Sequence, residues 1–518
     1  MSGLWPAGKR PREQRPSGQR REGAPRLWRQ PTLVAAGLLL VWMASGCAVG
    51  PSYQEPTIAP EGAAVGLSPR PDSIRAFYDS LAAADTAAAA PAMLEPDSAD
   101  LAWLAVLKDS TLLRLVNLAV RENRDVQTAV ARIREFRAQV GVARSGLFPE
   151  LSANAAASTN QVALGAFEPV AFDAFRVTAD VQWELDFWGR IRRGVQAARA
   201  DLQGEEAFYR STLLTLVSDV SNAYLELLEL AQEEEIAERT LASRRATLEL
   251  ARSRFESGVI SELDVHQFES EVAVPAASLA QARRLRSQRE HELAALVGRM
   301  PFTIPATASL AEAVEAVEVP DSLPAVLLAR RPDVRAAERA FAASVARVGI
   351  AQASRLPLVS ITGYYGSQSP TADDLFKSSA EVYQLQAGVS VPLFTGGRLA
   401  NQARAAGARA EQARLQFEQT VLQAFREASD ALVAVRTARD QRVAQQSQVV
   451  ALRKAVELAE IRYRGGVASY LEVLDAQRQL FSAELGLSQT QLLELSSVVG
   501  LYRALGGSWT TATQVGQE

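Results

Sequence analysis

Apolar and polar residues alternate along four short segments of the chain. From Val177 the sequence reads VTADVQWEL, with apolar and polar residues in turn, and QLQAGVSVPL at 384–393 has the same pattern. Weaker alternation follows two prolines, in LSANAAAST at 151–159 and VSITGYYGS at 359–367. A period of two residues predicts a β-strand with one apolar and one polar face. We therefore expect four strands, arranged as two hairpins.

Two settings suit strands of this kind. In a soluble protein, the apolar face would be half-buried against a core. In a membrane barrel, the apolar face would meet lipid and the polar face would line the lumen. Four strands are too few to close a barrel, and open sheet edges are not tolerated in lipid, so the membrane setting requires several chains to pool their strands.

Helical periodicity dominates the rest of the chain and is interrupted twice by a similar turn. The turns read RFESGVISELDV at 254–265 and RYRGGVASYLEV at 462–473, each centred on glycine. No proline lies between Arg190 and the first turn, or between Arg398 and the second. Each stretch could form one helix of about 67 residues, roughly 100 Å long. Glycine readily adopts the left-handed conformation that ends a helix, so each turn predicts a helical hairpin.

The return helix after the second turn carries a heptad pattern, which predicts coiled-coil packing. Apolar residues occupy most positions of a series with alternating steps of three and four residues, and Arg478 and Ser488 fill the other two. The apolar members are Leu471, Leu474, Phe481, Leu485, Leu492, Leu495 and Val499. Pro275 interrupts the corresponding helix of the first hairpin, where we expect a local kink.

A single offset of 208 residues relates the two halves of the chain. It pairs Gly258 with Gly466, and the same offset matches further positions along nearly 200 residues: Asp125 with Asp333, Pro149 with Pro357, Arg190 with Arg398, and Gly298 with Gly506. Such self-similarity indicates two tandem structural repeats. We expect these segments: a leader at 1–46, an extended strap at 47–100, repeat 1 at 101–298, a connector at 299–308, repeat 2 at 309–506, and a tail at 507–518.

The leader has the features of a secretory signal. Eight Lys or Arg against two acids precede the apolar run LVAAGLLLVWM at 33–43. That run is shorter than the about 20 apolar residues that a spanning helix needs. It ends in Ala-Ser-Gly before Cys47, which resembles a bacterial lipoprotein box. Cys47 is the single cysteine of the chain, so it is either an incidental thiol or the acylated first residue of a membrane-tethered mature chain.

Composition argues against catalysis and against nucleic-acid binding. The chain has two histidines and one cysteine, with no Gly-rich phosphate loop and no metal-ligand spacing. We therefore expect no enzyme activity, no cofactor and no metal. The formal net charge is −4; the leader carries +8 − 2 = +6, so the rest of the chain carries −4 − 6 = −10. An acidic mature chain without basic clusters is not typical of a nucleic-acid partner.

Several motifs together resemble the outer-membrane efflux factor family of the TolC and OprM type, in its lipoprotein branch. They are CAVGPSYQEP after the leader, LDFWGR at 185–190, PLFTGGR at 392–398 and YRGGVASYLEVLDAQR at 463–478. The resemblance covers roughly residues 47–507. It implies a mainly α fold with a small transmembrane β part. Three chains would pool their strands into a 12-stranded barrel in the outer membrane and their hairpins into a periplasmic α-helical tunnel.

The resemblance also implies partners and sites. The homotrimer would be lipid-anchored in the cell outer membrane, extend into the periplasm, and receive cargo through a periplasmic adaptor from an inner-membrane pump. It implies a gate with Leu471 as an apolar constriction and Asp475 as an acidic ring. Further gate residues are Tyr463, Glu472, Arg478 and, in the first turn, Asp264. The expected adaptor contacts are Gly258, Val259, Gly466 and Val467.

Alternatives remain at this point. Leu471 and Asp475 are four residues apart, so both could be ordinary members of a coiled-coil face. Some relatives carry an arginine where this chain has Ala468, and its absence favours the Leu/Asp closure over a salt-bridge lock. The favoured function is the exit duct of a tripartite efflux pump that conducts small molecules. The alternatives are a periplasmic coiled-coil tether without a channel, and the same channel serving protein secretion.

Overall fold

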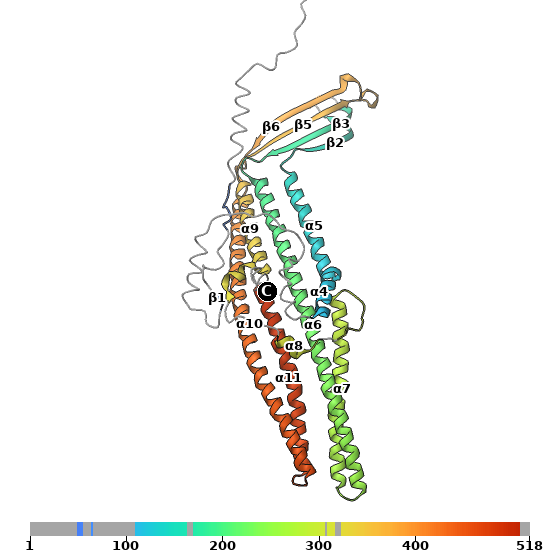
Figure 1. Cartoon of the computed structure of the whole chain (residues 1–518). Helices are drawn as coiled ribbons and strands as arrows, with labels where there is room; N and C mark the ends of the chain where they lie inside the picture. Colours follow the sequence, from blue (N-terminus) through green and yellow to red (C-terminus); the bar gives the residue numbers. More distant parts are fainter. Residues whose placement is uncertain are drawn as a thin grey trace, which may run out of the picture. The chain divides into compact units, whose positions relative to one another are not determined.

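The computed structural model describes residues 49–54, 64–65, 109–162, 169–305, 308–315 and 323–507. Long helices and one four-stranded sheet account for most of this part of the chain (Figure 1). The sequence-based prediction of a mainly α protein with two hairpins of strands is therefore confirmed. Cys47 and the other leader positions lie outside the described residues.

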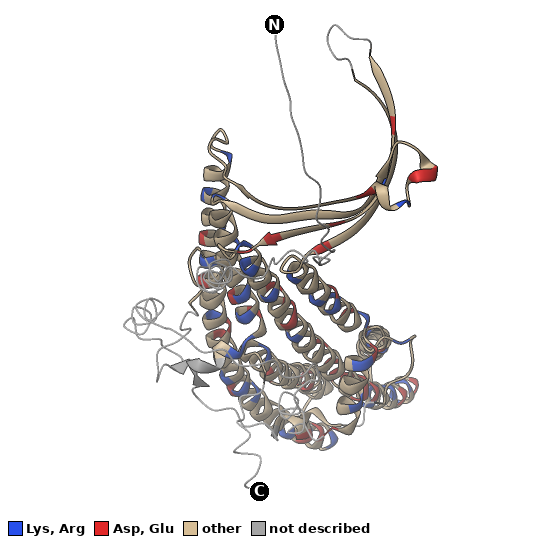
Figure 2. Ribbon diagram, turned by 90° about the horizontal axis from the view of Figure 1, so that it is seen from above, with Lys and Arg blue, Asp and Glu red and all other residues tan. Residues whose placement is uncertain are grey.

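The four strands form one antiparallel sheet. Its order is β2, β3, β5, β6, so β2 and β6 are the two edges. The strands run over Glu150–Val162, Val170–Leu185, Leu358–Ser369 and Glu381–Ser390. The pattern at 384–393 predicts a longer final strand, but β6 ends before Val391, because a residue before a proline and the proline itself fit poorly into a strand ladder. Seen from above, the sheet is curved (Figure 2).

The strand register gathers apolar residues on one face of the sheet. Ala179 of β3 lies opposite Ala153 of β2 and Tyr365 of β5, and Gly363 of β5 lies opposite Leu385 of β6. Tyr365 and Leu385 are both well exposed in the single chain. An exposed apolar face of this kind marks an interaction surface in a soluble protein or a lipid-facing surface.

The opposite face of the sheet is polar. Thr178 of β3 lies opposite Asn154 of β2, and Thr362 of β5 lies opposite Gln386 of β6. The Asn154 amide donates a hydrogen bond to the Asp180 carboxylate, with Nδ2 2.6 Å from Oδ2. The sheet is therefore amphipathic across its full width, as the period of two residues predicts.

The helices repeat with the offset found in the sequence. α5 and α9, α6 and α10, and α7 and α11 each begin 208 residues apart, and both long helices contain 67 residues. Their bounds are Arg124–Ser145 and Pro332–Ala353, Arg190–Glu256 and Arg398–Arg464, and Glu262–Leu296 and Tyr470–Leu505. At about 1.5 Å per residue, α6 and α10 are roughly 100 Å long. The predicted two-repeat layout is confirmed.

Smaller elements lie between the repeated helices. α7 continues through Pro275, so the proline does not end the helix. The remaining elements are α4 (Ser110–Glu122), α8 (Leu310–Glu315), the two-residue bridge of β1 (Ala64–Val65) with β4 (Leu323–Pro324), and the 3₁₀ turns η1 (Ala325–Arg330), η2 (Ala372–Asp374) and η3 (Ser378–Ala380).

The main core lies where the shorter helices pack against the long ones. Side chains of α4, α5, α6, α8 and α11 form one buried apolar cluster, and α9, α10 and α11 form a second. Tyr224 of α6 is fully buried, and its hydroxyl donates to Oδ2 of Asp109, 2.6 Å away. α11 contributes to both clusters, so the repeats share their hydrophobic packing rather than forming separate domains.

One buried carboxyl group lies in the seam between α6 and α11. Glu229 of α6 is 5% exposed, and Ser488 of α11 is fully buried beside it. Burial and the neighbouring carboxyl of Glu233 raise the pKa of Glu229 to about 8. Glu226, the other nearby acid, is paired with Arg289, with the Arg289 Nε 2.5 Å from a carboxylate oxygen. Burial in the seam therefore favours the neutral form of the Glu229 carboxyl group in the folded chain.

This pKa gives the first prediction. Because the folded-state pKa is raised above the ordinary value, the stabilisation is present below about pH 4.5 and is lost as pH rises through about 8. We expect the melting temperature of the wild type to fall by several degrees between pH 5 and 8.5, and that of Glu229→Gln to fall much less. Circular dichroism melts at one heating rate measure both.

The matched control is Glu235→Gln, which changes an exposed acid of the same helix. It should keep the pH dependence of the wild type. Parallel pH dependences for the wild type and Glu229→Gln would contradict a neutral Glu229 in the folded chain.

Candidate functional site

The two hairpin tips share the same backbone geometry. Gly258 and Gly466 have φ of +72° and +70°, in the left-handed region that favours glycine. In each turn the valine that follows donates its amide to the carbonyl of an arginine five residues earlier, with N···O distances of 2.9 Å for Val259 and 3.0 Å for Val467. Both valines are exposed, at 68% and 74%. The sequence-based explanation of the paired turns therefore holds at the level of single hydrogen bonds.

The two tips contact each other through aromatic rings. Tyr470 begins α11, and its ring lies 4.4 Å from Phe268 of α7 and 5.2 Å from Tyr463 of α10, measured between ring centroids. The guanidinium of Arg254 lies over the Tyr463 ring and donates a hydrogen bond to its hydroxyl. Tyr463, identified by resemblance, thus joins the second hairpin to the first.

A buried carboxylate adds an ionic contact between the hairpins. Glu271 of α7 is 4% exposed and is ion-paired with Arg244 of α6 and with Arg478 of α11. The hydrogen bond to Glu271 raises the pKa of the Arg478 guanidinium. Because Arg478 belongs to the other hairpin, we call the group of Arg244, Glu271 and Arg478 the tip latch.

The proposed gate residues lie on the same helix as Arg478, α11. Leu471 and Asp475 are both exposed, whereas Val473 and Leu474 between them are buried. The Asp475 carboxylate accepts a hydrogen bond from Gln479, with Nε2 2.7 Å from Oδ2. Leu471 and Asp475 thus form one exposed strip of an apolar and an acidic side chain.

Two further gate candidates have local partners. Glu472 pairs with Arg462 across the second turn, with Nε 3.0 Å from Oε1. Asp264 accepts hydrogen bonds from the backbone amide and hydroxyl of Ser261, at 2.9 and 2.8 Å, and so completes a capping box at the start of α7. These hydrogen bonds lower the pKa of Asp264. Among the described residues, Asp264 makes no hydrogen bond or ion pair with Tyr463 or Arg478.

Sequence reasoning missed Arg244, Arg254 and Glu271. Their partners come from helices more than 200 residues apart, or from the facing arm of the same hairpin. One available signal was Arg254, which the repeat offset pairs with Arg462. The missing information was which faces of the two hairpins meet.

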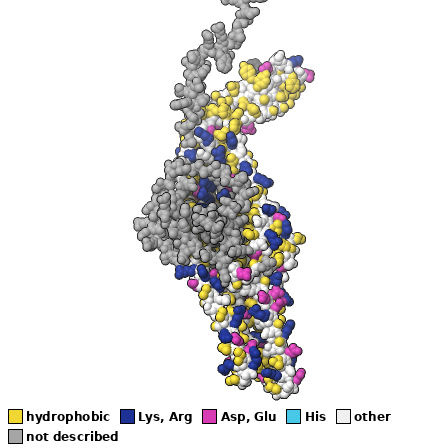
Figure 3. Space-filling view, viewed as in Figure 1, with side chains coloured by type: hydrophobic (Ala, Val, Ile, Leu, Met, Phe, Trp, Pro, Cys, Tyr) yellow, Lys and Arg dark blue, Asp and Glu magenta, His cyan; other side chains and the backbone are white. Residues whose placement is uncertain are grey.

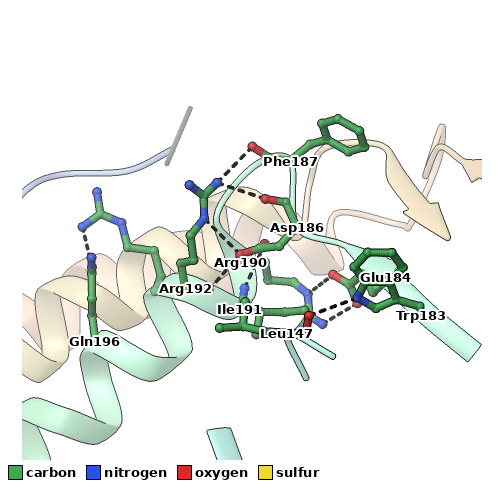
Figure 4. Close-up of polar contacts among 10 residues, drawn as sticks. Leu147, Trp183, Glu184, Asp186, Phe187, Arg190, Ile191, Arg192 and Gln196 are labelled. Carbon is green, nitrogen blue, oxygen red and sulfur yellow. Dashed lines mark hydrogen bonds and ion pairs between the residues drawn. The ribbon is translucent and has the colours of Figure 1, made fainter. Parts of the chain in front are cut away.

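At the other end of the helices, the sheet joins α6 through the LDFWGR motif (Figure 4). Arg190 and Glu184 form a bidentate ion pair, with N···O distances of 2.8 and 2.6 Å. Asp186 accepts the backbone amides of Ile191 and Arg192 at 3.0 and 2.8 Å, so its carboxylate caps the start of α6. The Trp183 indole donates to the Leu147 carbonyl at 3.1 Å. The motif fixes the direction in which the long helix leaves the sheet.

The segment after Cys47 docks at this junction. The Val49 amide donates to the Trp188 carbonyl, 3.0 Å away, and Arg193 donates to the Gly50 carbonyl at 3.1 Å. A Cβ on Gly50 would lie 2.5 Å from the Cα of Gly349, so only glycine allows this approach to α9. The Tyr53 hydroxyl donates to Glu338 of α9 at 2.8 Å, which gives the strap a second attachment.

The described residues offer little to a metal or a spanning helix. They contain no group of three or more His, Cys, Asp or Glu side chains arranged to hold a metal ion. Among their helices, none combines the length and hydropathy that crossing a bilayer requires.

The fold and the tips place this chain in a class of proteins that have two tandem helical hairpins and one amphipathic sheet to which both repeats contribute strands. The family model for outer membrane efflux proteins matches residues 115–299 and 323–507, two segments with the same offset of 208. The chain belongs to this outer membrane efflux protein family, which is a family of efflux proteins and not of enzymes.

Known proteins agree with this assignment. The chain is 33% identical to the probable efflux pump outer membrane protein TtgC of Pseudomonas putida over 473 residues, which cover 90% of this chain and 94% of TtgC. It is also 33% identical to the solvent efflux pump outer membrane protein SrpC of Pseudomonas putida over 480 residues, 91% and 97% of the two chains.

Solved structures show the same fold. The outer-membrane channel OprN superposes with a TM-score of 0.76 at 30% identity, covering 89% of this chain and all of OprN. The open-state MtrE outer membrane channel of Neisseria gonorrhoeae superposes with a TM-score of 0.75 at 28% identity, covering 89% and 98%.

The tip latch gives the second prediction. In Glu271→Gln the buried Arg244 loses its anionic partner, a change that typically costs about 3–5 kcal/mol for a buried pair. We expect faster amide hydrogen exchange in residues 254–271 and 463–478, measured by mass spectrometry on the folded protein, with little change in the main core.

Glu269→Gln is the matched control, since it removes an exposed acid paired with Arg252 on the same helix. Its exchange should resemble that of the wild type. Equal exchange in both variants would show that the latch does not hold the hairpins together.

Proposed function

We propose that the chain is the outer-membrane exit duct of a tripartite efflux pump. Three copies would pool twelve strands into a barrel and six helical hairpins into a periplasmic tunnel. One observation carries the proposal: the sheet exposes an apolar face, presents a polar opposite face and ends in two edge strands. Such a sheet is unstable in lipid unless its edges are paired, and pooling with further copies pairs them.

The alternatives fit this sheet less well. A periplasmic tether has no use for large apolar side chains exposed across four strands, such as Tyr365, Tyr383 and Leu385. A duct for protein secretion would share the architecture, but relatives are named for toluene, solvent and antibiotic efflux. We therefore favour small molecules as cargo, supplied by an inner-membrane pump through a periplasmic adaptor.

The gate proposal rests on the exposed strip of Leu471 and Asp475. Around a threefold axis, three leucines would exclude water from a narrow opening and three carboxylates would attract cations. The latch and the contact of Tyr463 with Arg254 would hold each second hairpin against the first and so keep the strip in place. Val259 and Val467, exposed at the far ends of the turns, are the proposed adaptor contacts, with Gly258 and Gly466 shaping the turns.

Conductance gives the third prediction. In planar bilayers the purified lipoprotein should pass small, flickering currents, and the Leu471→Ala, Asp475→Ala double variant should pass a steady current at least several-fold larger. The reason is that both changes remove the side chains that narrow the opening.

The matched control is Leu493→Ala, Gln489→Ala, which changes a leucine and a polar residue of α11 far from the turn. It should conduct like the wild type. A wild type that is already wide open would remove Leu471 and Asp475 as the gate, and a folded protein without any conductance would contradict the duct itself.

Lipid anchoring at Cys47 is part of the same proposal. Val49, two residues further on, is hydrogen-bonded where the sheet joins the helices, the level at which a barrel would leave the membrane. Acyl chains on Cys47 would therefore be attached two residues along the chain from this junction.

Acylation gives the fourth prediction. Cells fed labelled palmitate should incorporate the label into the wild type and into Ser45→Ala, but not into Cys47→Ala, because only the Cys47 position provides the acceptor. Gel fluorography after purification measures the label. A wild type without label, or a labelled Cys47→Ala variant, would contradict the anchor.

A further inference from the structure

Arginines concentrate in the four segments that join the sheet to the helices. These segments are 144–150, 184–193, 354–358 and 390–398, and each of the four helices that meet the sheet has an arginine at that end. On the face drawn in Figure 3, hydrophobic side chains cover much of the sheet, and dark blue Lys and Arg side chains gather below it over the helix ends. The junction thus has a boundary between apolar and cationic surface.

Three exposed arginines of these segments have no ionic partner, whereas the buried Arg193 donates to the Gly50 carbonyl. Arg190 and Arg192 are paired with Glu184 and Asp186. Arg144, Arg355 and Arg398, which we call the basic collar, are exposed and form no ion pair with any described residue.

The collar has few charged neighbours. Within the described residues, the Arg398 guanidinium donates only to the Gln402 side chain, at 3.4 Å. The one other carboxylate in these segments is Glu150, so positive charge is in excess.

The repeat explains why Arg398 is free. It corresponds to Arg190 in repeat 1, but the position of Glu184 is occupied by Pro392 in repeat 2. The same arginine is therefore neutralised within the chain in one repeat and left available in the other.

Exposed apolar side chains lie next to the collar. Phe148 follows Arg144 by four residues, Leu358 follows Arg355 by three, and Phe394 precedes Arg398 by four; all three apolar side chains are exposed. A cation beside an apolar side chain matches a phospholipid, whose phosphate adjoins its acyl chains.

The opposite ends of the strands carry the opposite charge. Asp173, Asp373 and Glu381 lie there, and Lys377, the cation of that turn, is already paired with Asp374. Arg176, the other cation near that end among the described residues, stacks on the Tyr364 ring. Acids outnumber cations there, so the excess of positive charge lies on the helix side of the sheet.

We propose that the basic collar binds the phosphate groups of anionic phospholipids in the periplasmic leaflet of the outer membrane. The inference rests on the proposed function, because it requires the sheet to be inserted in a bilayer. Each guanidinium offers several donors in a fork that matches a phosphate, and anionic lipid attracts cations within a Debye length of the surface.

The test uses the mature lipoprotein in nanodiscs of phosphatidylcholine with a minor fraction of phosphatidylglycerol bearing brominated acyl chains. Bromine quenches nearby tryptophans, and Trp183 and Trp188 lie at the junction. Wild type should show stronger quenching by the brominated anionic lipid than by brominated phosphatidylcholine. In Arg144→Gln, Arg355→Gln, Arg398→Gln the relative binding constant should fall by on the order of 100-fold, at about tenfold per 1.4 kcal/mol and about 1 kcal/mol per arginine.

The control changes three exposed arginines of the hairpins that also lack ion pairs, as Arg245→Gln, Arg436→Gln, Arg439→Gln. It should keep the preference of the wild type.

Two further tests do not depend on the folding of the Gln variant. A triple Arg→Lys variant of the collar should retain most of the preference for the anionic lipid. Added salt should weaken that preference in the wild type.

The outcomes separate the two proposals. A wild type that inserts and conducts but binds both lipids equally would overturn the collar and leave the duct intact. Equal loss in the collar and hairpin variants would also overturn it, by showing a general charge effect. A wild type that fails to enter nanodiscs at all would contradict the proposed function first.

Discussion

Backbone hydrogen bonding at the edges of the sheet constrains everything else in this molecule. In the single chain, β2 and β6 each pair on one side only. The free amides and carbonyls would be solvated in water, but each costs several kcal/mol if it enters hydrocarbon without a partner. The apolar face favours insertion of the sheet into lipid, but the unpaired edges make insertion of a single chain unfavourable. Only association that pairs β6 of one copy with β2 of another satisfies both requirements.

The helices meet a different requirement, which is to keep two helices of roughly 100 Å rigid with a thin core. Aromatic and aliphatic packing is concentrated where the short helices cover the long ones. Beyond that region, the tip cluster of Leu248, Ala251 and Phe268 is small. Buried ionic contacts such as Glu271 with its two arginines fix how the hairpins are aligned. They add little net stability, because desolvation offsets much of the attraction. Near the tips, register between the hairpins therefore depends on a few specific polar pairs.

The sequence predicts whatever repeats with a local period. Alternation placed all four strands, the absence of proline gave two helices of the observed length, and the glycine turns gave both tips. Contacts between distant segments were not accessible in this way. The partners of Glu271, the docking of Gly50 against Gly349 and the use of Asp264 as a helix cap depend on which faces meet in three dimensions. Local periodicity shows which side of a helix or strand is apolar, but not which other segment packs against it.

The two repeats differ where they join the sheet: the junction of repeat 1 is closed by polar contacts within the chain, and that of repeat 2 is not. In repeat 1, Trp188 donates to the Pro357 carbonyl at 2.7 Å and Glu184 neutralises Arg190, so the junction is completed within the chain. In repeat 2 the corresponding positions are Gly396 and Pro392, and the neighbouring Leu393 and Phe394 are 93% and 91% exposed. A junction that is closed by its own polar pairs needs no partner, whereas exposed apolar side chains are stabilised by burial against one. The two junctions therefore differ in role. The repeat 1 junction is completed by contacts within the chain, and the repeat 2 junction leaves apolar side chains exposed for contact with another copy.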